Sequence, residues 1–498
     1  MDVTAEFMPP TIEWFVLSPY ITLLAGALVL LLVGSLTPRW PRGWYAIVAA
    51  TTAGIAGVLA GLQFAALETE AARTLVKGTI AHDRFGLVAI IVVCFTVVMS
   101  AMTTSDAASG DSLETYALML TSALGAAVMV SANDLLVAFL GIEILSLSLY
   151  VLAASDRRRS ASQEAGLKYF ILGGFASAFL LYGIALVYGT TGQTNFGGIA
   201  TVLADEVTVP RNDTMLLAGV ALLVVGFGFK TSLVPFHSWT PDVYQGAPTH
   251  VTGFMASLGK VAAVVAFVRL FVVSFPARAD DWRPVVFVLA ILTLVVGSVL
   301  AIVQTDVKRM LAYSSISHAG FMLVGLEAAG HIGSSSAADG VSSTLTYVVL
   351  YSVLALGSFA VVSVVSHGAA ATSLDAFRGV AKRQPVFALG FTVLLLAQAG
   401  VPLTSGFVAK FGVIRAVVST ESYVLAVVAM VSAVIAAYLY LRIMVSMWLA
   451  EPDSSAPATT LSLPARVVLV VSVAVTLVVG VLPSVVLDFT DSLTALAR

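Results

Sequence analysis

The sequence predicts an all-α polytopic membrane protein with about fourteen transmembrane helices. Of its 498 residues, 59% are hydrophobic and only 11% are charged, whereas a soluble domain has about 25% charged residues. The mean hydropathy is +0.99, and apolar runs of the length needed to cross a bilayer, about 20 residues, recur along the chain. The net charge of −3 and the lack of a basic run give no indication of a nucleic-acid partner.

The predicted spans follow the apolar runs in chain order. Short polar connections separate most of them, so we expect no inserted soluble domain. The runs cover residues 17–36, 44–65, 84–104, 113–131, 133–154, 164–188, 214–234, 249–273, 283–304, 307–328, 343–366, 385–417, 423–448 and 465–487.

Two of these segments depart from a simple span. Segment 385–417 is too long for one straight crossing and contains Pro402, and segment 214–248 contains Pro235 after a long apolar run. Proline breaks a helix, and a break inside a membrane persists only where protein or a polar cavity satisfies the freed backbone groups. Paired breaks are typical of inverted repeats in transporters. The sequence therefore predicts two inverted five-helix repeats, each with one broken helix.

This organisation divides the chain into four parts. They are N-terminal helices 1–3 (1–112), the first repeat with helices 4–8 (113–273), the second, inverted repeat with helices 9–13 (283–448), and a C-terminal loop with helix 14 (449–498).

The loops indicate an orientation, because Lys and Arg are more frequent in loops on the cytoplasmic side. If fourteen helices alternate, most of these cations fall on one side, and both termini are predicted to lie on the opposite, outer side. The inner-side cations are Arg39, Arg42, Arg157, Arg158, Arg159, Lys308, Arg309, Arg378, Lys382 and Arg383.

Four charged residues lie within apolar runs: Glu143, Lys230, Lys260 and Lys410. A charge at the bilayer centre costs roughly 3 kcal/mol on insertion scales. Lys260 is too far from either end of its run for its ammonium to reach the headgroups. Charges of both signs at this depth predict a path for protons or ions.

The candidate partner of Glu143 is Lys168, one and a half turns into the next span. Two alternatives stay open at this point: Glu143 as a protonated buried carboxyl, and Lys168 extended to the headgroups. A carboxylate beside a buried lysine favours the charged form of that lysine. Moving or protonating the carboxylate would therefore switch the lysine, as a proton pump requires.

Two histidines are candidate proton relays, because histidine titrates near neutral pH. His237 follows Pro235, and His318 lies in the run AYSSISHAGF. The alternative for each is a hydrogen-bonded packing residue. His250 begins another span, and the sequence assigns it no role.

Several kinds of site are not expected in this chain. Cys94 is the only cysteine, whereas an iron–sulfur cluster needs about four thiolates. No glycine-rich dinucleotide fingerprint follows a strand, and GFMASLGK has the wrong spacing for a phosphate-binding loop. We therefore expect no redox centre, bound cofactor or metal site in this chain.

Three runs carry a family resemblance: FKTSLVPFHSWTPDVYQGAPTHVTGFMASLGK (229–260), DVKRMLAYSSISHAGFMLVG (306–325) and GVPLTSGFVAKF (400–411). They resemble the antiporter-like membrane subunits of respiratory complex I, the NADH-quinone oxidoreductase, which are related to Mrp-type Na⁺/H⁺ antiporters. The run PDVYQGAP, the lysine at Lys410 and the chain length favour the subunit N type.

The resemblance implies a role for each candidate residue. The members of a proton-translocating axis would be the helix-5 glutamate Glu143, its partner Lys168, the broken-helix lysines Lys230 and Lys410, the helix-8 lysine Lys260, and the histidines His237 and His318.

The resemblance also implies a setting for the chain. It would be a translocase subunit in the bacterial inner membrane, driven by electron transfer from NADH to quinone in other subunits, which would hold the NADH, FMN, iron–sulfur and quinone sites. Its partners would be subunits M, K and J and the lipid bilayer. The alternatives are an Mrp-type cation/proton antiporter, a subunit of a complex with another donor such as formate, and a scaffold.

Overall fold

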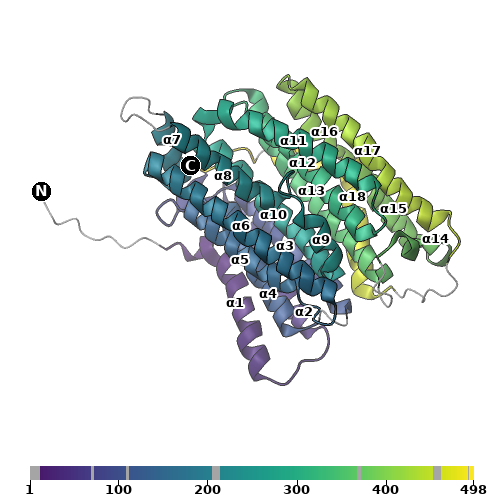
Figure 1. Cartoon of the computed structure of the whole chain (residues 1–498). Helices are drawn as coiled ribbons and strands as arrows, with labels where there is room; N and C mark the ends of the chain where they lie inside the picture. Colours follow the sequence, from purple (N-terminus) through teal and green to yellow (C-terminus); the bar gives the residue numbers. More distant parts are fainter. Residues whose placement is uncertain are drawn as a thin grey trace, which may run out of the picture.

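The computed structural model describes residues 12–68, 72–107, 111–204, 213–366, 372–452, 461–491 and 493–497. Long helices pack side by side in a bundle (Figure 1), and a single apolar core connects nearly all of them. This confirms the predicted all-α membrane class.

The helices that begin the chain are α1 (Trp14–Leu36), α2 (Trp44–Ala66), α3 (Arg84–Asp106), α4 (Leu113–Ser131), α5 (Leu135–Ala153), α6 (Ser160–Thr191), α7 (Phe196–Ala204), α8 (Asp213–Thr231), α9 (Trp239–Gly246) and α10 (Thr249–Ser274). The remainder are α11 (Ala279–Ile302), α12 (Val307–Ala329), α13 (Ser335–Ser366), α14 (Val380–Arg383), α15 (Pro385–Ala399), α16 (Ser405–Ser419), α17 (Tyr423–Trp448), α18 (Leu463–Val481) and α19 (Ser484–Asp491).

Among the described residues, twelve helices are long and apolar enough to cross a membrane. Each coincides with a predicted span, and α4 and α17 have the predicted limits. The two other predicted spans correspond to α12 and to the pair α15 and α16, which fall outside that length and composition range. The count of fourteen therefore stays a prediction.

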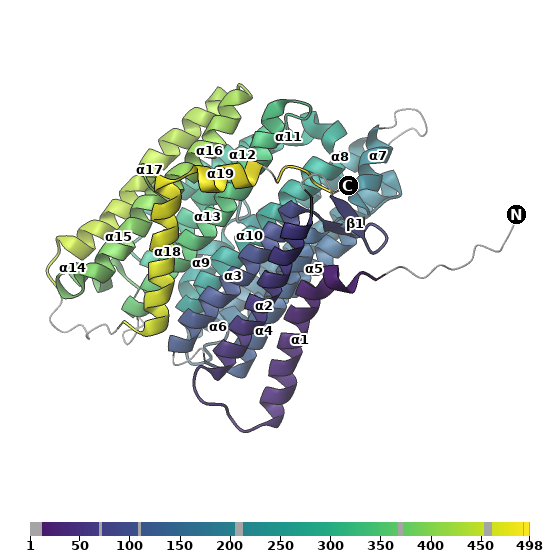
Figure 2. The same ribbon diagram turned by 180° about the vertical axis from the view of Figure 1, so that it is seen from behind.

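Small elements at the helix ends were not predicted. A hairpin pairs β1 (Arg73–Leu75) with β2 (Ile80–His82) ahead of α3. The predicted run 465–487 is in fact two helices, because Pro483 interrupts it between α18 and α19. Figure 2 shows α19 lying crosswise at the end of α18. Short elements of this kind are missed because hydropathy does not change across them.

Both predicted helix breaks are present. The first separates α8 from α9 and the second separates α15 from α16. Side chains satisfy the freed backbone groups of the first break: the Trp239 indole donates to the Phe229 carbonyl at 3.1 Å, and the Val234 amide donates to the Thr293 hydroxyl at 3.1 Å. If the short helices α7 and α14 are left out, the broken helix is fourth in each predicted repeat. The repeat boundaries themselves stay predictions.

A fully buried ion pair joins helices at the predicted outer side. Arg269 of α10 makes two bonds to Asp83, at 2.5 and 2.7 Å, and both side chains are 0% exposed. Asp83 also accepts from the Gly86 amide at 2.8 Å, which caps α3, and from the Ala497 amide at 2.9 Å. Burial alone would raise the pKa of Asp83, but the Arg269 guanidinium and these amides hold the pKa below its usual value. The pair thus connects α3, α10 and the C-terminal tail.

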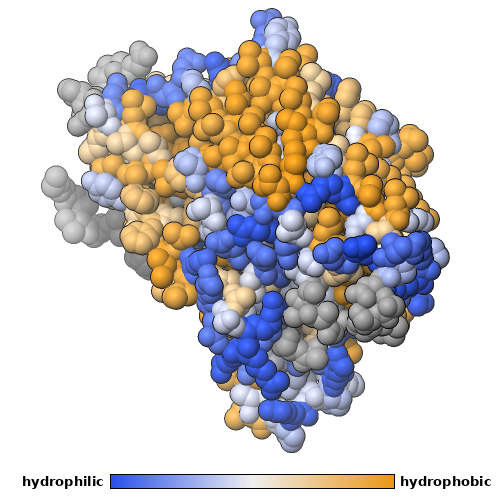
Figure 3. Space-filling model, turned by 45° about the vertical axis from the view of Figure 1, so that its right-hand side comes forward, coloured by the Kyte–Doolittle hydropathy of each residue, from blue (hydrophilic) through white to orange (hydrophobic). Residues whose placement is uncertain are grey.

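The surface carries a broad apolar region with polar residues concentrated beside it (Figure 3). Large apolar side chains are exposed on α1, α5, α6 and α17. Such a surface is stable only against lipid or another membrane protein.

Candidate functional site: an axis of buried lysines

Lys230 lies in the last turn of α8 and is buried. Its Nζ donates to the Tyr150 hydroxyl at 3.1 Å. The same nitrogen lies 5.2, 5.6 and 5.3 Å from the ring centroids of Tyr150, Tyr169 and Phe229. Aromatic faces attract a cation at this distance. The ammonium is therefore held by three rings and one neutral hydroxyl.

Lys260 of α10 is also buried, and its Nζ donates to the Thr231 carbonyl. Thr231 is the last residue of α8, so the ammonium lies at the negative end of that helix. Lys230 and Lys260 both line one small cavity of about 10 Å³, roughly the space that one water molecule needs. The first break thus brings two lysines to one enclosed space.

Glu143 and Lys168 occupy separate sites. Lys168 is 42% exposed and forms ion pairs with Glu164 at 2.6 Å and Asp242 at 3.0 Å, whereas half-buried Glu143 accepts from the Ser177 hydroxyl. The predicted Glu143–Lys168 pair is therefore wrong for this structure. Ser177 lies nine residues beyond Lys168 on α6, about 14 Å along the axis.

Glu143 nevertheless belongs to the Lys230 site. Its carboxylate acts electrostatically on both Lys230 and Tyr150. The carboxylate therefore lies within electrostatic range of Lys230, without a direct contact to it among the described residues, and the predicted carboxylate–lysine switch stays a prediction.

Lys410 of α16 is held by the second break. Its Nζ donates to the carbonyls of Gln398 and Ala399 at 2.8 and 2.9 Å, the last carbonyls of α15, and lies 5.0 Å from the Phe321 ring centroid. Gly400 has a φ of +89°, and a Cβ there would lie 2.9 Å from the Lys410 Cδ. A glycine is needed at this position for both reasons.

His318 is buried on α12 between two tyrosines. Its Nδ1 lies 2.7 Å from the Tyr347 hydroxyl and its Nε2 lies 3.3 Å from the Tyr440 hydroxyl. Both Lys260 and Lys410 act electrostatically on it. His318 therefore lies within electrostatic range of one lysine from each half.

A chain of hydrogen bonds leads from His318 to the side chain of Gln398. The hydroxyls of Tyr440 and Ser314 lie 2.6 Å apart, and Ser314 donates to Oε1 of Gln398 at 3.4 Å. The backbone carbonyl of Gln398, a separate acceptor from Oε1, accepts from Lys410. Helix α12 supplies His318 and Ser314, whereas α15, α16 and α17 supply Gln398, Lys410 and Tyr440 in turn.

His237 is placed differently from the other candidates. It lies half-buried at the first break, two residues after exposed Pro235, and the described contacts do not connect it to a buried lysine or to His318. His250 is buried in the first turn of α10. The predicted relay role of His237 stays a prediction.

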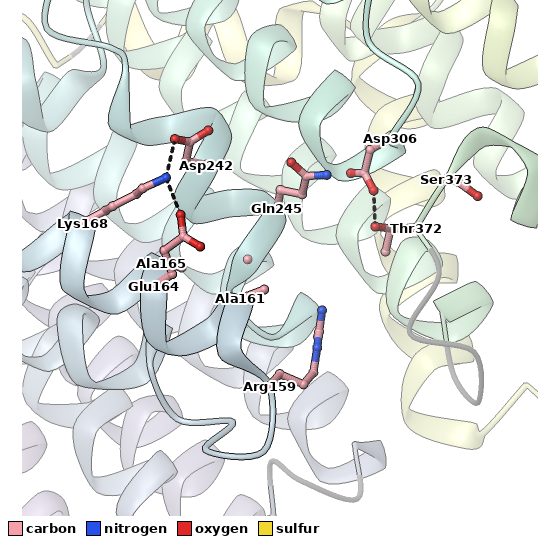
Figure 4. Close-up of a pocket in the computed structure, with 11 residues that line it drawn as sticks. Arg159, Ala161, Glu164, Ala165, Lys168, Asp242, Gln245, Asp306, Thr372 and Ser373 are labelled. Carbon is pink, nitrogen blue, oxygen red and sulfur yellow. Dashed lines mark hydrogen bonds and ion pairs between the residues drawn. The ribbon is translucent and has the colours of Figure 1, made fainter.

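A polar pocket of about 420 Å³ lies at the predicted inner side, among α6, α9 and the start of α12. Figure 4 shows Lys168 between Asp242 and Glu164, with Asp306 across the pocket beside Thr372. Asp242 also accepts from Arg309 at 2.6 Å. Five of the eleven residues that line the pocket are charged, and both signs are present.

Sequence reasoning did not single out Tyr150, Ser314, Gln398 or Tyr440, which connect the predicted residues. Each is a polar side chain within an apolar span, and that was the available signal. Their partners lie far away in sequence, so only the fold shows which groups meet. Among the described residues, no cluster of three or more His, Cys, Asp or Glu is arranged to hold a metal ion.

Comparisons with known proteins identify similar sequences over most of the chain. A family model described as "NADH:quinone oxidoreductase/Mrp antiporter, TM" matches residues 132–436. A protein named NADH-quinone oxidoreductase subunit N from Rhodococcus opacus is 48% identical over 76% of this chain and 69% of its own length. One of the same name from Saccharopolyspora erythraea is 40% identical over 97% of this chain and 98% of its own.

Solved structures of similar fold include a chain of respiratory complex I and a chain of an Mrp complex. A chain of respiratory complex I from Thermus thermophilus with bound aureothin superposes with a TM-score of 0.79 at 32% identity, covering 94% of this chain and 98% of that one. A chain of the Mrp complex from Dietzia has a TM-score of 0.84 at 20% identity, covering 97% and 96%. The latter likeness shows the fold alone.

Proposed function

The chain belongs to the family of NADH:quinone oxidoreductase and Mrp antiporter transmembrane subunits, and from this premise we propose that it translocates protons as an N-type subunit of an NADH-quinone oxidoreductase. The relatives with this subunit name and the complex I chain of similar fold support the assignment. Electron transfer takes place in other subunits, which hold the NADH, FMN, iron–sulfur and quinone sites.

One observation carries the proposal: the buried lysines are held by neutral groups. Lys260 and Lys410 donate to backbone carbonyls, and Lys230 donates to a tyrosine hydroxyl. Burial without a directly bonded carboxylate disfavours the ammonium relative to the neutral amine. Each lysine can therefore release and regain a proton, which an exposed or tightly paired lysine does not do readily.

The contacts indicate an order for the path. Lys230 and Lys260 share a cavity, and His318 is influenced by Lys260 and Lys410. The network from His318 through Tyr440 and Ser314 ends at the side chain of Gln398, whose backbone carbonyl binds Lys410. A proton would pass along Lys230, Lys260, His318 and Lys410. Lys168 and His237 would lie beside this proton path and would not be among its members.

Glu143 would connect this path to the rest of the complex. It lies on the exposed face of α5 between Leu140 and Leu147, which are 55% and 53% exposed. A half-buried carboxylate on an apolar face is costly against lipid, so a neighbouring membrane subunit is expected to cover it. Subunits M, K and J are the proposed neighbours, in a bacterial inner membrane with both termini outside.

The second candidate function is that of an Mrp-type cation/proton antiporter subunit, because the matching family model is described for both kinds of protein. The two differ in partners and in the driving reaction. Co-purification with an NADH-oxidising arm supports the first function. Cation/proton exchange without NADH or quinone supports the second.

The test of the proposed function replaces Lys230 by alanine in the assembled complex in proteoliposomes. We expect a detectable complex without NADH-driven proton pumping. The matched control is Lys382→Ala at a 45% exposed lysine paired with Glu451, which should pump normally. Full pumping by the Lys230→Ala complex would contradict the proposed function.

A further inference from the structure

Lys308 is a buried lysine at the predicted inner end of α12. From the sequence it counts among the loop cations, yet it is only 1% exposed. Its Nζ donates to the Ala247 carbonyl at 2.5 Å. Ala247 caps the C-terminal end of α9, the second half of the first broken helix. Lys308 is therefore part of the interior and contacts the broken helix.

This arrangement repeats that of two axis lysines. Lys260 donates to the last carbonyl of α8 and Lys410 to the last carbonyls of α15. In all three cases, an ammonium from another helix meets the negative end of a half-helix. The likeness points to the same chemistry at Lys308.

Lys308 lies behind the wall of the polar pocket at the predicted inner side, because Gly246, which lines the pocket, precedes the Ala247 carbonyl that Lys308 binds. Asp306 and Arg159, which line that pocket, are the charged groups that act electrostatically on Lys308. The exposed side chains of Glu164 and Lys168, at 64% and 42%, show that the pocket is open to solvent. The lysine is thus placed between water and the helix interior.

On its other side, Lys308 is followed by the polar network of α12. Ser314 lies six residues further along, about 9 Å along the helix axis. Ser314 belongs to the hydrogen-bonded chain that reaches His318 through Tyr440 and ends at the side chain of Gln398. The transfer requires a water to bridge the gap between the Lys308 ammonium and Ser314, and from there the network continues to His318.

We propose that Lys308 takes up protons from this pocket and passes them to the α12 network, as the innermost proton carrier of the chain. In one cycle, the ammonium gives a proton to a bridging water, which passes a proton on to the Ser314 hydroxyl network, and the neutral amine regains a proton from hydronium in the pocket. One proton enters from the pocket and one leaves toward the α12 network, so charge and atoms balance. This inference rests on the proposed proton translocation.

The decisive variant is Lys308→Arg. Arginine keeps a positive charge and donors for the Ala247 carbonyl, but it stays protonated. If Lys308 carries protons, the Lys308→Arg complex should assemble and lose NADH-driven pumping. The matched control, Lys382→Arg on the same predicted side, should pump normally. Normal pumping by Lys308→Arg would overturn the inference and leave Lys308 as a cap of α9.

Two further measurements keep the outcome unambiguous. Lys230→Ala is tested in parallel with Lys308→Arg. If both complexes pump normally, the proposed function fails. If Lys230→Ala loses pumping and Lys308→Arg pumps normally, only the Lys308 inference fails. If Lys308→Arg does not assemble, Lys308→His decides. A proton carrier with the lower intrinsic pKa of histidine should shift the pH profile of pumping to lower pH, and an unshifted profile would overturn the inference.

Discussion

The molecule contains buried cations of two kinds. At the predicted outer side, Arg269 is closed in a two-bond ion pair with Asp83, without exposure to solvent. Within the span region, Lys230, Lys260 and Lys410 are held by hydroxyls, rings and carbonyls. The Arg269–Asp83 pair holds a proton that is not exchanged, because arginine stays protonated and the Asp83 carboxylate neutralises its charge.

The difference separates structure from function. A buried charge with a direct counter-ion connects helices, and removing one partner is strongly destabilising. A buried lysine on neutral dipoles can lose its proton without leaving an unpaired carboxylate. We therefore expect substitutions at the outer pair to affect stability, and substitutions along the axis to affect pumping.

The largest effect on stability is expected for Asp83→Asn. It leaves Arg269 buried without its counter-ion and should lower the free energy of unfolding by roughly 3–5 kcal/mol. Thermal unfolding in detergent, followed by tryptophan fluorescence, measures this loss. The control Asp375→Asn changes an 85% exposed carboxylate and should have little effect. Equal stability of the two variants would contradict the structural role of the pair.

The same pair should give a pH dependence. Because the folded-state pKa of Asp83 lies below its ordinary value, the pair stabilises the chain fully above the unfolded pKa of about 3.9. The stabilisation is lost as the pH falls through the lower folded-state pKa. The stability difference between wild type and Asp83→Asn should therefore be constant near neutral pH and shrink below about pH 4. A constant difference down to the lowest accessible pH would contradict this account.

Gly400→Ala should have an intermediate effect on both properties. A left-handed residue other than glycine costs roughly 1–2 kcal/mol, and the new methyl would displace the Lys410 side chain. Gly174→Ala, where a Cβ meets nothing within 4 Å, is the control in helix α6. Reduced pumping for Gly400→Ala alone is the expected result. Unchanged pumping would show that the position of Lys410 is not critical.

Tyr440→Phe should have the smallest effect. It removes one hydroxyl from the network and keeps the ring, so the loss corresponds to the two hydrogen bonds to Ser314 and His318, each worth about 0.5–1.5 kcal/mol. We expect the pumping rate to fall by roughly tenfold or less, since water can replace the hydroxyl in part. Tyr438→Phe, on the same helix with a ring that is 52% exposed, is the control. Identical rates for the two variants would remove Tyr440 from the path.

The sequence predicted twelve of the spans, both breaks and the burial of Lys230, Lys260 and Lys410, because these depend on local hydropathy and on proline. It did not predict which groups meet. The sequence pairs Lys168 with Glu143, whereas the structure pairs it with Asp242. Spacing along one helix does not show which neighbouring helix a side chain faces. Arg269 lies within an apolar run, and that was a signal, but its partner Asp83 is far away in sequence.

Lys260→Arg tests the central claim most directly, because it keeps the charge at the end of α8 and removes the exchangeable proton. The measurement is the number of protons translocated per NADH oxidised, in proteoliposomes that contain the assembled complex. The account predicts an assembled, stable complex with a reduced ratio. A wild-type ratio would show that the charge alone is needed, and that protons do not pass through this lysine.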